Sequence, residues 1–472
     1  MPKVPAGMVD KAGGYAAEGD DDKSDLKRVR GWSVITAGFC LELIGAGLSF
    51  PVLPYFALQD LGGKATHLGM MAGFFSLSQA VGAGVFGALS DAIGRKPLIL
   101  NAFVIAGCGW LLTSLAPSIN WLIAARGLAG ISGGSIPFMQ AITCDMSVAT
   151  DRASMLALVG ASVGLATIIG PAAAALLEAY LGLNRRLILA ASGGFGLTAF
   201  LIGYWFFVES HPQERRRRQQ SLYNNNSNKT LAPYDDAEAA IPLCGGRGAW
   251  EGISCVGVSL CCLGKLLTML CFAVMPATYP ALLRDSFGFG DIELGLILFF
   301  GGVVGAMTQL CVLTHLMHIA GPHGLVVIGA TLLGFGLALE PPLAAALGFQ
   351  AHLMAVLAFS VGVAILLPGF ANLVSLYSTE AHQGWAQGIL NSSRACALIL
   401  GYMCAGVLYD KLGPTWPYLL GGVMALCGGA AAYAAHLLAT PVVAIESIEK
   451  KSSKGVATVA RRVMKAHGLC RC

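Results

Sequence analysis

Four charged residues lie inside long apolar runs of this 472-residue chain. At the helical rise, Glu42, Lys265 and Arg394 lie about 15 Å from the start of their runs, and Arg126 about 10 Å from the nearer end. An unpaired charge at such a depth costs about 3 kcal/mol on an insertion scale. We therefore expect these side chains to face a wet cavity, where they neutralise one another or a bound solute.

The four charges comprise three cations and one anion, which leaves a net charge of +2. Such a cavity favours an anionic solute with a carboxylate or phosphate. We expect Glu42 to pair with Arg126 or Lys265 in one state and to be protonated in another, which links proton movement to alternating access. A purely structural ion pair of Glu42 is the alternative. Neutral polar residues nearby either line the same cavity or join helices by hydrogen bonds. They are Gln79, Gln140, Gln309, Asn372 and Asn391.

Composition sets the class of protein to which these charges belong. Hydrophobic residues make up 56% of the chain and charged residues only 12%, against about 25% charged in a soluble domain. This composition argues against a soluble enzyme and predicts an all-α membrane protein with twelve helices of about 20 to 25 residues. The net charge of +4 gives no sign of nucleic-acid binding. We find no spacing typical of a metal site, a disulfide framework or a nucleotide phosphate loop, and we expect no cofactor.

The apolar runs divide into two sets of six. The predicted spans are 32–56, 67–89, 97–117, 119–143, 154–177 and 187–208, then 254–282, 292–314, 324–340, 353–376, 384–408 and 416–438. Pro341 and Pro342 are expected to end the ninth span. The resulting domains are a tail 1–31, a six-helix bundle 32–208, a polar linker 209–253, a second bundle 254–438 and a basic tail 439–472.

The distribution of positive charge predicts the orientation. Both tails and the linker lie on one face of a protein with twelve spans, and that face carries most of the 30 Lys and Arg residues. The positive-inside rule places this face in the cytoplasm. Plasma membrane and organelle membrane both remain open. Cys470 and Cys472, at the end of the second tail, are candidates for lipidation.

The two halves resemble each other weakly in sequence. Pro51 and Asp60 recur 225 residues later as Pro276 and Asp285, and further matches follow at slowly rising offsets up to 231. An ordered rise of this kind is expected of a six-helix duplication with small insertions. Parallel halves of this kind are typical of transporters with a binding site between them, near the middle of the membrane.

A motif between the second and third spans reads Gly87-Ala-Leu-Ser-Asp91-Ala-Ile-Gly94-Arg95-Lys96-Pro97. It resembles the cytoplasmic loop signature of the major facilitator superfamily. The resemblance implies a conformational gate formed by Gly87, Asp91, Gly94, Arg95 and Lys96. In this gate Asp91 caps a helix of the opposite half and Arg95 holds Asp91 in place. Ala92 departs from the family pattern, which has a basic residue there. In the second half His318, Pro322 and His323 replace the charged residues, so we expect one half to carry the gate.

Two further motifs support the resemblance. Arg126-Gly-Leu-Ala-Gly130 resembles the second motif of the superfamily, which implies a role for Arg126 in proton coupling together with Glu42. Gly164 and Gly170-Pro171 resemble an antiporter motif, although Ala174 and Ala175 stand where that motif has glycines. Gly-Pro can equally be a packing notch. The chain thus resembles the drug:proton antiporter branch, which includes the bacterial tetracycline exporters.

These observations predict a non-enzymatic, proton-coupled carrier of a small organic solute, with an anion favoured. Three alternatives remain. One is an efflux antiporter for cationic or neutral drugs, and another is a membrane receptor or scaffold that has lost transport. The third is an intramembrane serine protease, because Gly130-Ile-Ser132-Gly133 matches a GxSG motif. That chemistry needs a histidine base, for which only His352 lies within reach of a span. The sequence leaves the oligomeric state open.

Overall fold

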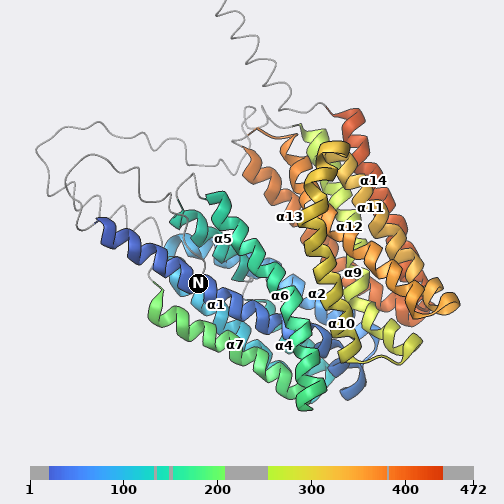
Figure 1. Ribbon diagram of the computed structural model, residues 1–472, viewed down its shortest axis with the longest axis horizontal. Coiled ribbons are helices and arrows are strands. Elements are labelled where there is room, and N and C mark those ends of the chain that lie inside the picture. The colour runs from blue at the N-terminus through green and yellow to red at the C-terminus, as the bar shows by residue number, and fades with distance from the viewer. Residues whose placement is uncertain (1–20, 132–134, 148–151, 208–253, 380–381, 440–472) are drawn as a thin grey trace, which may run out of the picture.

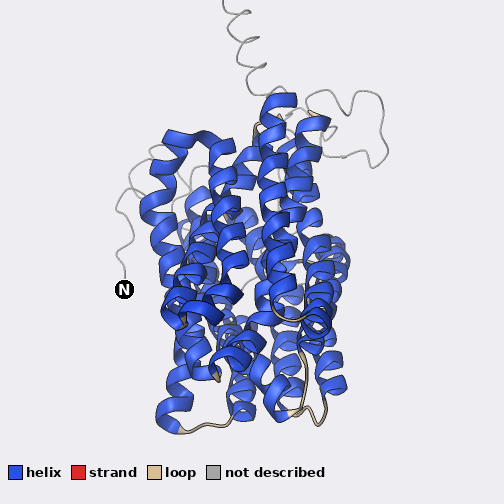
Figure 2. Ribbon diagram, turned by 90° about the vertical axis from the view of Figure 1, so that its right-hand side faces the viewer, coloured by secondary structure: helices blue, strands red, loops and turns tan. Residues whose placement is uncertain are grey.

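The computed structural model describes residues 21–131, 135–147, 152–207, 254–379 and 382–439. Helices make up nearly all of these ranges, as Figure 2 shows. Eleven helical segments are long and apolar enough to cross a membrane. One of them, Asp291–Leu347, contains two crossings, because Gly321 has φ 67° and interrupts the helix. The twelve spans predicted from the sequence are therefore confirmed.

The first six spans form the N-terminal bundle. They are α1 (Asp21–Tyr55) with its π-helical continuation η2 (Phe56–Asp60), α2 (Ala65–Ile93), α3 (Arg95–Ser114), α4 (Ile119–Gly130) followed by α5 (Ser135–Met146), α6 (Arg152–Leu181) and α7 (Arg185–Phe206). Polar caps begin several of these helices. The Asn184 side chain, for example, accepts a hydrogen bond from the backbone N–H of Leu187 at the start of α7.

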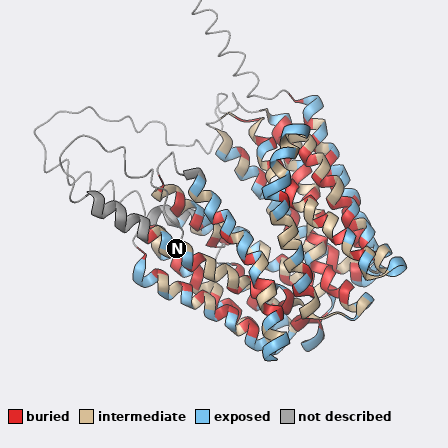
Figure 3. Cartoon of the chain, in the orientation of Figure 1, coloured by how far each residue is buried: buried red, intermediate tan, exposed pale blue. Residues whose placement is uncertain are grey.

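The second six spans form the C-terminal bundle. They are α9 (Cys255–Phe287), α10 (Asp291–Met307) with its π-helical continuation η5 (Thr308–Val312), the part of α11 (Leu313–Leu347) that follows Gly321, α12 (Phe349–Ser375), α13 (Gln383–Leu412) and α14 (Thr415–Leu438). Figure 3 shows buried residues between the helices and exposed residues along the outer faces. The exposed set includes many large apolar side chains, as expected for contact with lipid.

The two ends of the molecule differ. We call the end where α1 and α9 begin and α7 and α14 end the tail side, and the opposite end the distal side. In Figure 1 the bundles converge at the distal side and diverge toward the tail-side ends of α5 and α13. Contacts between bundles join α2 to α13 and α6 to α10. Gly69, Gly406 and Gly295 lie in these contacts, where an added Cβ would collide with backbone atoms of the other bundle.

The ninth span corrects one expectation from the sequence. Pro341 and Pro342 do not end this helix, which continues to Leu347. Proline removes two backbone hydrogen bonds of the helix, but membrane helices tolerate proline where neighbouring helices pack around it. Pro341 is buried in this way, within the C-terminal bundle. The helix is therefore longer than predicted, and it brings Glu340 inside the protein.

Candidate functional site: a cavity between the bundles

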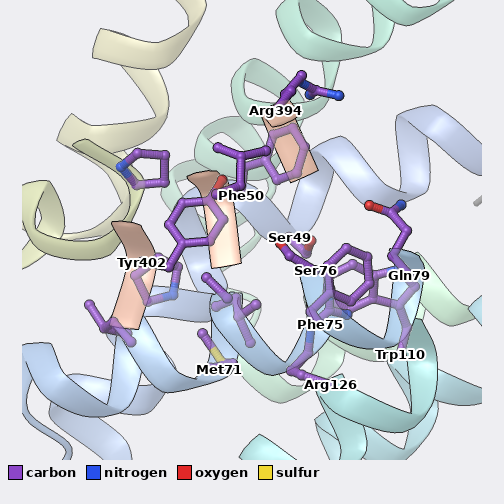
Figure 4. Close-up of a pocket in the computed structure, with 16 residues that line it drawn as sticks. Ser49, Phe50, Met71, Phe75, Ser76, Gln79, Trp110, Arg126, Arg394 and Tyr402 are labelled. Atoms are coloured by element: carbon purple, nitrogen blue, oxygen red, sulfur yellow. The ribbon is translucent and has the colours of Figure 1, made fainter. Parts of the chain in front are cut away.

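A cavity of about 290 Å³ lies between the two bundles (Figure 4). The N-terminal bundle contributes most of its wall, from α1, α2, α3 and α4, and the C-terminal bundle contributes residues of α9 and α13. Its volume is close to the lower limit of pockets that enclose small organic ligands. Aromatic side chains form much of the wall. They are Phe50, Phe75, Trp110 and Tyr402.

Arg126 lies in this wall as a buried cation. Its side chain is 8% exposed, and its guanidinium carbon lies 4.0 Å from the ring centre of Trp110 and 4.6 Å from that of Phe75. Both rings attract the cation through their negative faces. Among the described residues no carboxylate or carbonyl accepts a hydrogen bond from Arg126. Its N–H groups are therefore available to an acceptor that enters the cavity.

Arg394 brings a second positive charge to the cavity from α13. Its side chain is exposed, and Figure 4 shows it on the other side of the cavity from Arg126. The remaining polar lining consists of the amide of Gln79 and three hydroxyls, those of Ser49, Ser76 and Tyr402. Among the described lining residues none is acidic. The cavity therefore presents two guanidinium groups with no compensating carboxylate in its wall.

Glu42 lies on α1 and is half-buried. Its Oε2 atom accepts a hydrogen bond of 2.7 Å from the Ser135 hydroxyl of α5. Within the described part of the chain it makes no ion pair with Arg126 or Lys265 in this conformation. Glu42 is not among the lining residues of the cavity, so it faces Ser135 rather than the two arginines.

Lys265 is buried on α9 and also lies outside the cavity lining. It is 4% exposed, and its Nζ atom lies 5.2 Å from the ring centre of Phe370. Of the nine residues proposed from the sequence for the cavity, three line it: Gln79, Arg126 and Arg394. The four remaining amide residues are exposed and outside this lining. They are Gln140, Gln309, Asn372 and Asn391.

The predicted gate motif lies at the tail side. Arg95 forms a salt bridge of 3.0 Å with Asp145 at the end of α5, and the Lys96 ammonium donates a hydrogen bond to the Tyr204 carbonyl oxygen. Gly94, with φ 101°, separates α2 from α3. Gly87 and Asp91 belong to α2, and the Asp91 side chain lies outside the described residues. In the second half, His323 forms a hydrogen bond of 2.8 Å with the Tyr377 hydroxyl.

Gly170 and Gly164 of α6 have different surroundings. A Cβ atom at Gly170 would collide with Gly47 of α1, so this glycine permits the close approach of the two helices. At Gly164 the same position is open space. Pro171 lies within α6, and its carbonyl oxygen is near Gly295 of the other bundle. Gly170 and Pro171 therefore lie in packing contacts of α6, one within the bundle and one between bundles.

An ion pair that the sequence did not predict joins the bundles at the distal side. Arg185 of α7 donates to both carboxylate oxygens of Asp291 in the C-terminal bundle, at 2.6 and 2.8 Å. The same guanidinium bonds Asp60 and Gln59 of its own bundle. Asp291 is only 3% exposed. We call this arrangement the Arg185 clamp. Arg185 directly precedes an apolar run and Asp291 begins another, but sequence alone does not show that the two helix ends meet.

A second link across the distal side joins α2 to α13. The backbone N–H and the hydroxyl of Thr66 both donate to Oδ2 of Asp410, at 2.7 and 2.5 Å. Asp410 lies near the C-terminal end of α13, and Thr66 at the start of α2. The two links lie on different pairs of helices. The distal side is therefore closed by polar contacts as well as by close helix packing.

Two six-helix bundles around a charged central cavity, closed at one end by links between the bundles, define a membrane transporter. A family model described as Major Facilitator Superfamily matches residues 35–346 and 261–469. The chain belongs to the major facilitator superfamily. The chain also resembles the drug-efflux branch of this superfamily, since its relatives include tetracycline and quinolone resistance proteins.

Two curated relatives and one solved structure illustrate the similarity. The class C tetracycline resistance protein of Escherichia coli is 28% identical over 394 residues, which cover 81% of this chain and 90% of that protein. Major facilitator superfamily domain-containing protein 10 of Mus musculus is 26% identical over 353 residues, 73% of each chain. The crystal structure of the human organic anion transporter MFSD10 matches with a TM-score of 0.60 at 20% identity, covering 86% of this chain and 99% of that one. The structural match supports the fold.

Proposed function

We propose that this transporter carries a small organic anion across the membrane and that protons drive the movement. One observation carries the choice of an anion: the cavity wall contains two arginines and, among its described residues, no acid. Arginine binds a carboxylate through two parallel N–H donors, which gives geometric specificity as well as energy. The human structure that shares this fold is described as an organic anion transporter, which supports the same substrate class.

The aromatic wall adds a second element of the proposal. Phe50, Phe75 and Trp110 give the cavity a large apolar surface between its charged groups. An anion with an apolar or aromatic body therefore fits better than a small inorganic anion, because the body gains contact area while the charge reaches arginine. This surface also favours the alternative of drug efflux, which the tetracycline-resistance relatives support. The charge of the transported compounds distinguishes the two.

Glu42 is the proposed site of proton coupling. Its carboxylate lies within the membrane on α1 and is bonded to Ser135. When Glu42 is deprotonated, rearrangement of α1 and α4 brings it to Arg126, and an incoming anion competes for the same guanidinium. Proton and solute then bind in an order that links their movements. If the tail side is cytoplasmic, as the Lys and Arg distribution indicates, the closed distal side makes this conformation the inward-facing one.

Transport by purified protein in proteoliposomes tests the proposal. We expect saturable uptake of aromatic carboxylates, with proton flux evoked by the solute, and at least a tenfold loss of uptake in Arg394→Gln. Arg284→Gln is the matched control, because Arg284 lies at the distal surface beside Asp285 and away from the cavity. Glu42→Gln is expected to lower the number of protons moved per solute. Saturable uptake of permanent cations that anions do not inhibit would overturn the anion proposal, and unchanged pH dependence in Glu42→Gln would overturn the coupling role.

A further inference from the structure

Glu340 is a second acidic residue inside the membrane, far along the chain from Glu42 and outside the cavity lining. Its side chain is 0% exposed, and neither carboxyl oxygen has a hydrogen-bond partner among the described residues. Buried polar groups are nearly always hydrogen-bonded, so an unpartnered carboxyl requires an explanation. An ionised carboxylate without a partner in such surroundings is far too costly to persist.

The helices packed around Glu340 bring no permanent positive charge to it within the described structure. α11 contacts α9, α12 and α14. The titratable groups of these neighbours that lie beside Glu340 are Cys271 and Tyr279 of α9, His352 of α12 and Tyr418 of α14, all buried. Of these only the imidazole of His352 can become a cation. The cations Lys265 and Arg284 of α9 instead contact Phe370 and Asp285. A bound proton is therefore the simplest species that makes this carboxyl compatible with its site.

His352 and Tyr279 form a polar pair beside Glu340. The Tyr279 hydroxyl lies 3.1 Å from His352 Nε2, and the two rings stack with their centres 5.6 Å apart. His352 Nδ1 lies 3.4 Å from the backbone carbonyl oxygen of Glu340. This imidazole therefore lies between the backbone of Glu340 and the hydroxyl of Tyr279. It is the one group of the cluster whose two ring nitrogens can accept a proton on one side and donate one on the other.

The cluster also lies close to the distal closure. Tyr55 of α1 is fully buried with an unpartnered hydroxyl and belongs to the same buried cluster as Tyr279. It ends α1, directly before the π-helical turn η2 that carries Asp60 of the Arg185 clamp. Tyr55 thus connects the helix end next to the Arg185 clamp with the cluster that contains Tyr279, whose hydroxyl bonds His352. Opening of the clamp brings water to the first of these groups. Because the Glu340 carboxyl has no hydrogen-bond partner among the described residues in the closed state, the entering water is what links it to His352 and Tyr279.

We propose that Glu340 is a second proton-binding site of the transporter, loaded in this conformation and exchanging with the distal solution through Tyr279 and His352 when the Arg185 clamp opens. The proton leaves the carboxyl as H⁺ and returns to the same oxygen atoms, so the step needs no other reactant. The role of Glu340 in the transport cycle depends on the proton-coupled transport proposed above. The protonation of Glu340 in the closed state does not depend on it.

Infrared spectroscopy of the full-length protein in lipid tests the proton directly. At pH 7 we expect a protonated-carboxyl stretching band that Glu340→Gln removes and that Asp285→Asn leaves intact, since Asp285 is an exposed carboxylate. Glutamine has the shape of the protonated acid, so the variant is expected to fold. Glu42→Gln identifies any component that belongs to Glu42. A spectrum in which Glu340→Gln removes no band overturns the proposal. His352→Phe is a second variant, which leaves the Glu340 side chain unaltered. Loss of the imidazole is expected to shift the frequency of the carboxyl band of Glu340.

Transport measurements test the place of Glu340 in the cycle. In proteoliposomes we expect the ratio of protons to solute to fall by one in Glu340→Gln while Glu42 still supports solute-evoked proton flux. An unchanged ratio together with the infrared band would show that Glu340 holds a static proton, and it would overturn the exchange step. If no solute evokes a proton flux in the unaltered protein, the coupling proposal for Glu42 fails, while the infrared result still decides whether Glu340 binds a proton.

Discussion

At the scale of single residues, the cation at position 126 is held by aromatic rings rather than by an acid. Trp110 and Phe75 fix the guanidinium of Arg126 in the absence of solute, so little side-chain freedom is lost when an anion binds. An internal carboxylate would instead have to be displaced by the solute. The arrangement therefore favours binding of an anion to a cation that is already in position.

Arg126→Lys tests the importance of the planar guanidinium. Lysine keeps the charge but loses both the paired donors and the extended contact with the rings, so we expect affinity for the anion to fall at least tenfold, or about 1.4 kcal/mol. Binding is measured by calorimetry or by uptake at varied concentration. Arg284→Lys is the control for the same chemical change outside the cavity. Equal affinity in Arg126→Lys and the unaltered protein would show that charge alone matters at this position.

Sequence predicted part of this site, for physical reasons that differ between residues. Arg126 and Arg394 could be identified because a charge inside an apolar run needs a compensating environment. The aromatic wall could not, since Phe and Trp in a membrane helix are as suited to lipid as to a cavity. Glu340 escaped notice because its position beside two prolines placed it at the expected end of a span. Only the continuation of α11 to Leu347 reveals its burial.

At the scale of helices, the close contact between α1 and α6 depends on residues that have no side chain. Gly170 meets Gly47 where α1 and α6 approach each other, whereas Gly164, on the same helix, faces open space. The span limits were predictable to within about five residues from apolar length and charge, apart from the beginning of α1 and the end of α11. The specific helix pairs were not predictable, because many glycines are present and sequence does not show which of them lie in contacts.

Gly170→Leu and Gly164→Leu form a matched pair for these contacts. We expect Gly170→Leu to lower thermal stability in detergent by the cost of overpacking, about 1 to 3 kcal/mol, because the new side chain collides with the backbone of α1. Gly164→Leu is expected to change stability by less than about 0.5 kcal/mol. Thermal unfolding followed by intrinsic fluorescence measures both. Similar losses in the two variants would contradict the assigned contact.

At the scale of the whole molecule, the distal closure stabilises one of the two states of the carrier. The Arg185 clamp and the bond between Thr66 and Asp410 both cross between bundles. The tail-side salt bridge between Arg95 and Asp145 instead joins two helices of the same bundle. The one ion pair that joins the two bundles among the described residues, Arg185–Asp291, therefore lies at the distal side, opposite the motif that the sequence singled out as a gate.

Arg185→Gln is expected to shift the population toward a distal-open state. Without the guanidinium, the nearly buried carboxylate of Asp291 loses its positive partner, which opposes closure. Genetically encoded spin labels at the exposed positions Leu181 and Leu347, one in each bundle, report the distal separation. We expect a longer-distance population to appear in Arg185→Gln but not in Arg284→Gln, whose partner lies in its own helix. Identical distance distributions in the two variants would show that helix packing alone keeps the distal side closed.

The two guanidinium groups in a wall whose described residues include no acid also give the membrane voltage a role. Moving one elementary charge across a membrane potential of 100 mV changes its free energy by about 2.3 kcal/mol. The cavity carries two positive charges when empty, one with a singly charged anion bound, and none with a doubly charged anion. Voltage therefore acts most strongly on the empty carrier and least on one loaded with a dianion. For the proposed anion transport, the voltage dependence of the solute-loaded step therefore falls as the charge of the anion rises, and each coupled proton adds its own charge to the total.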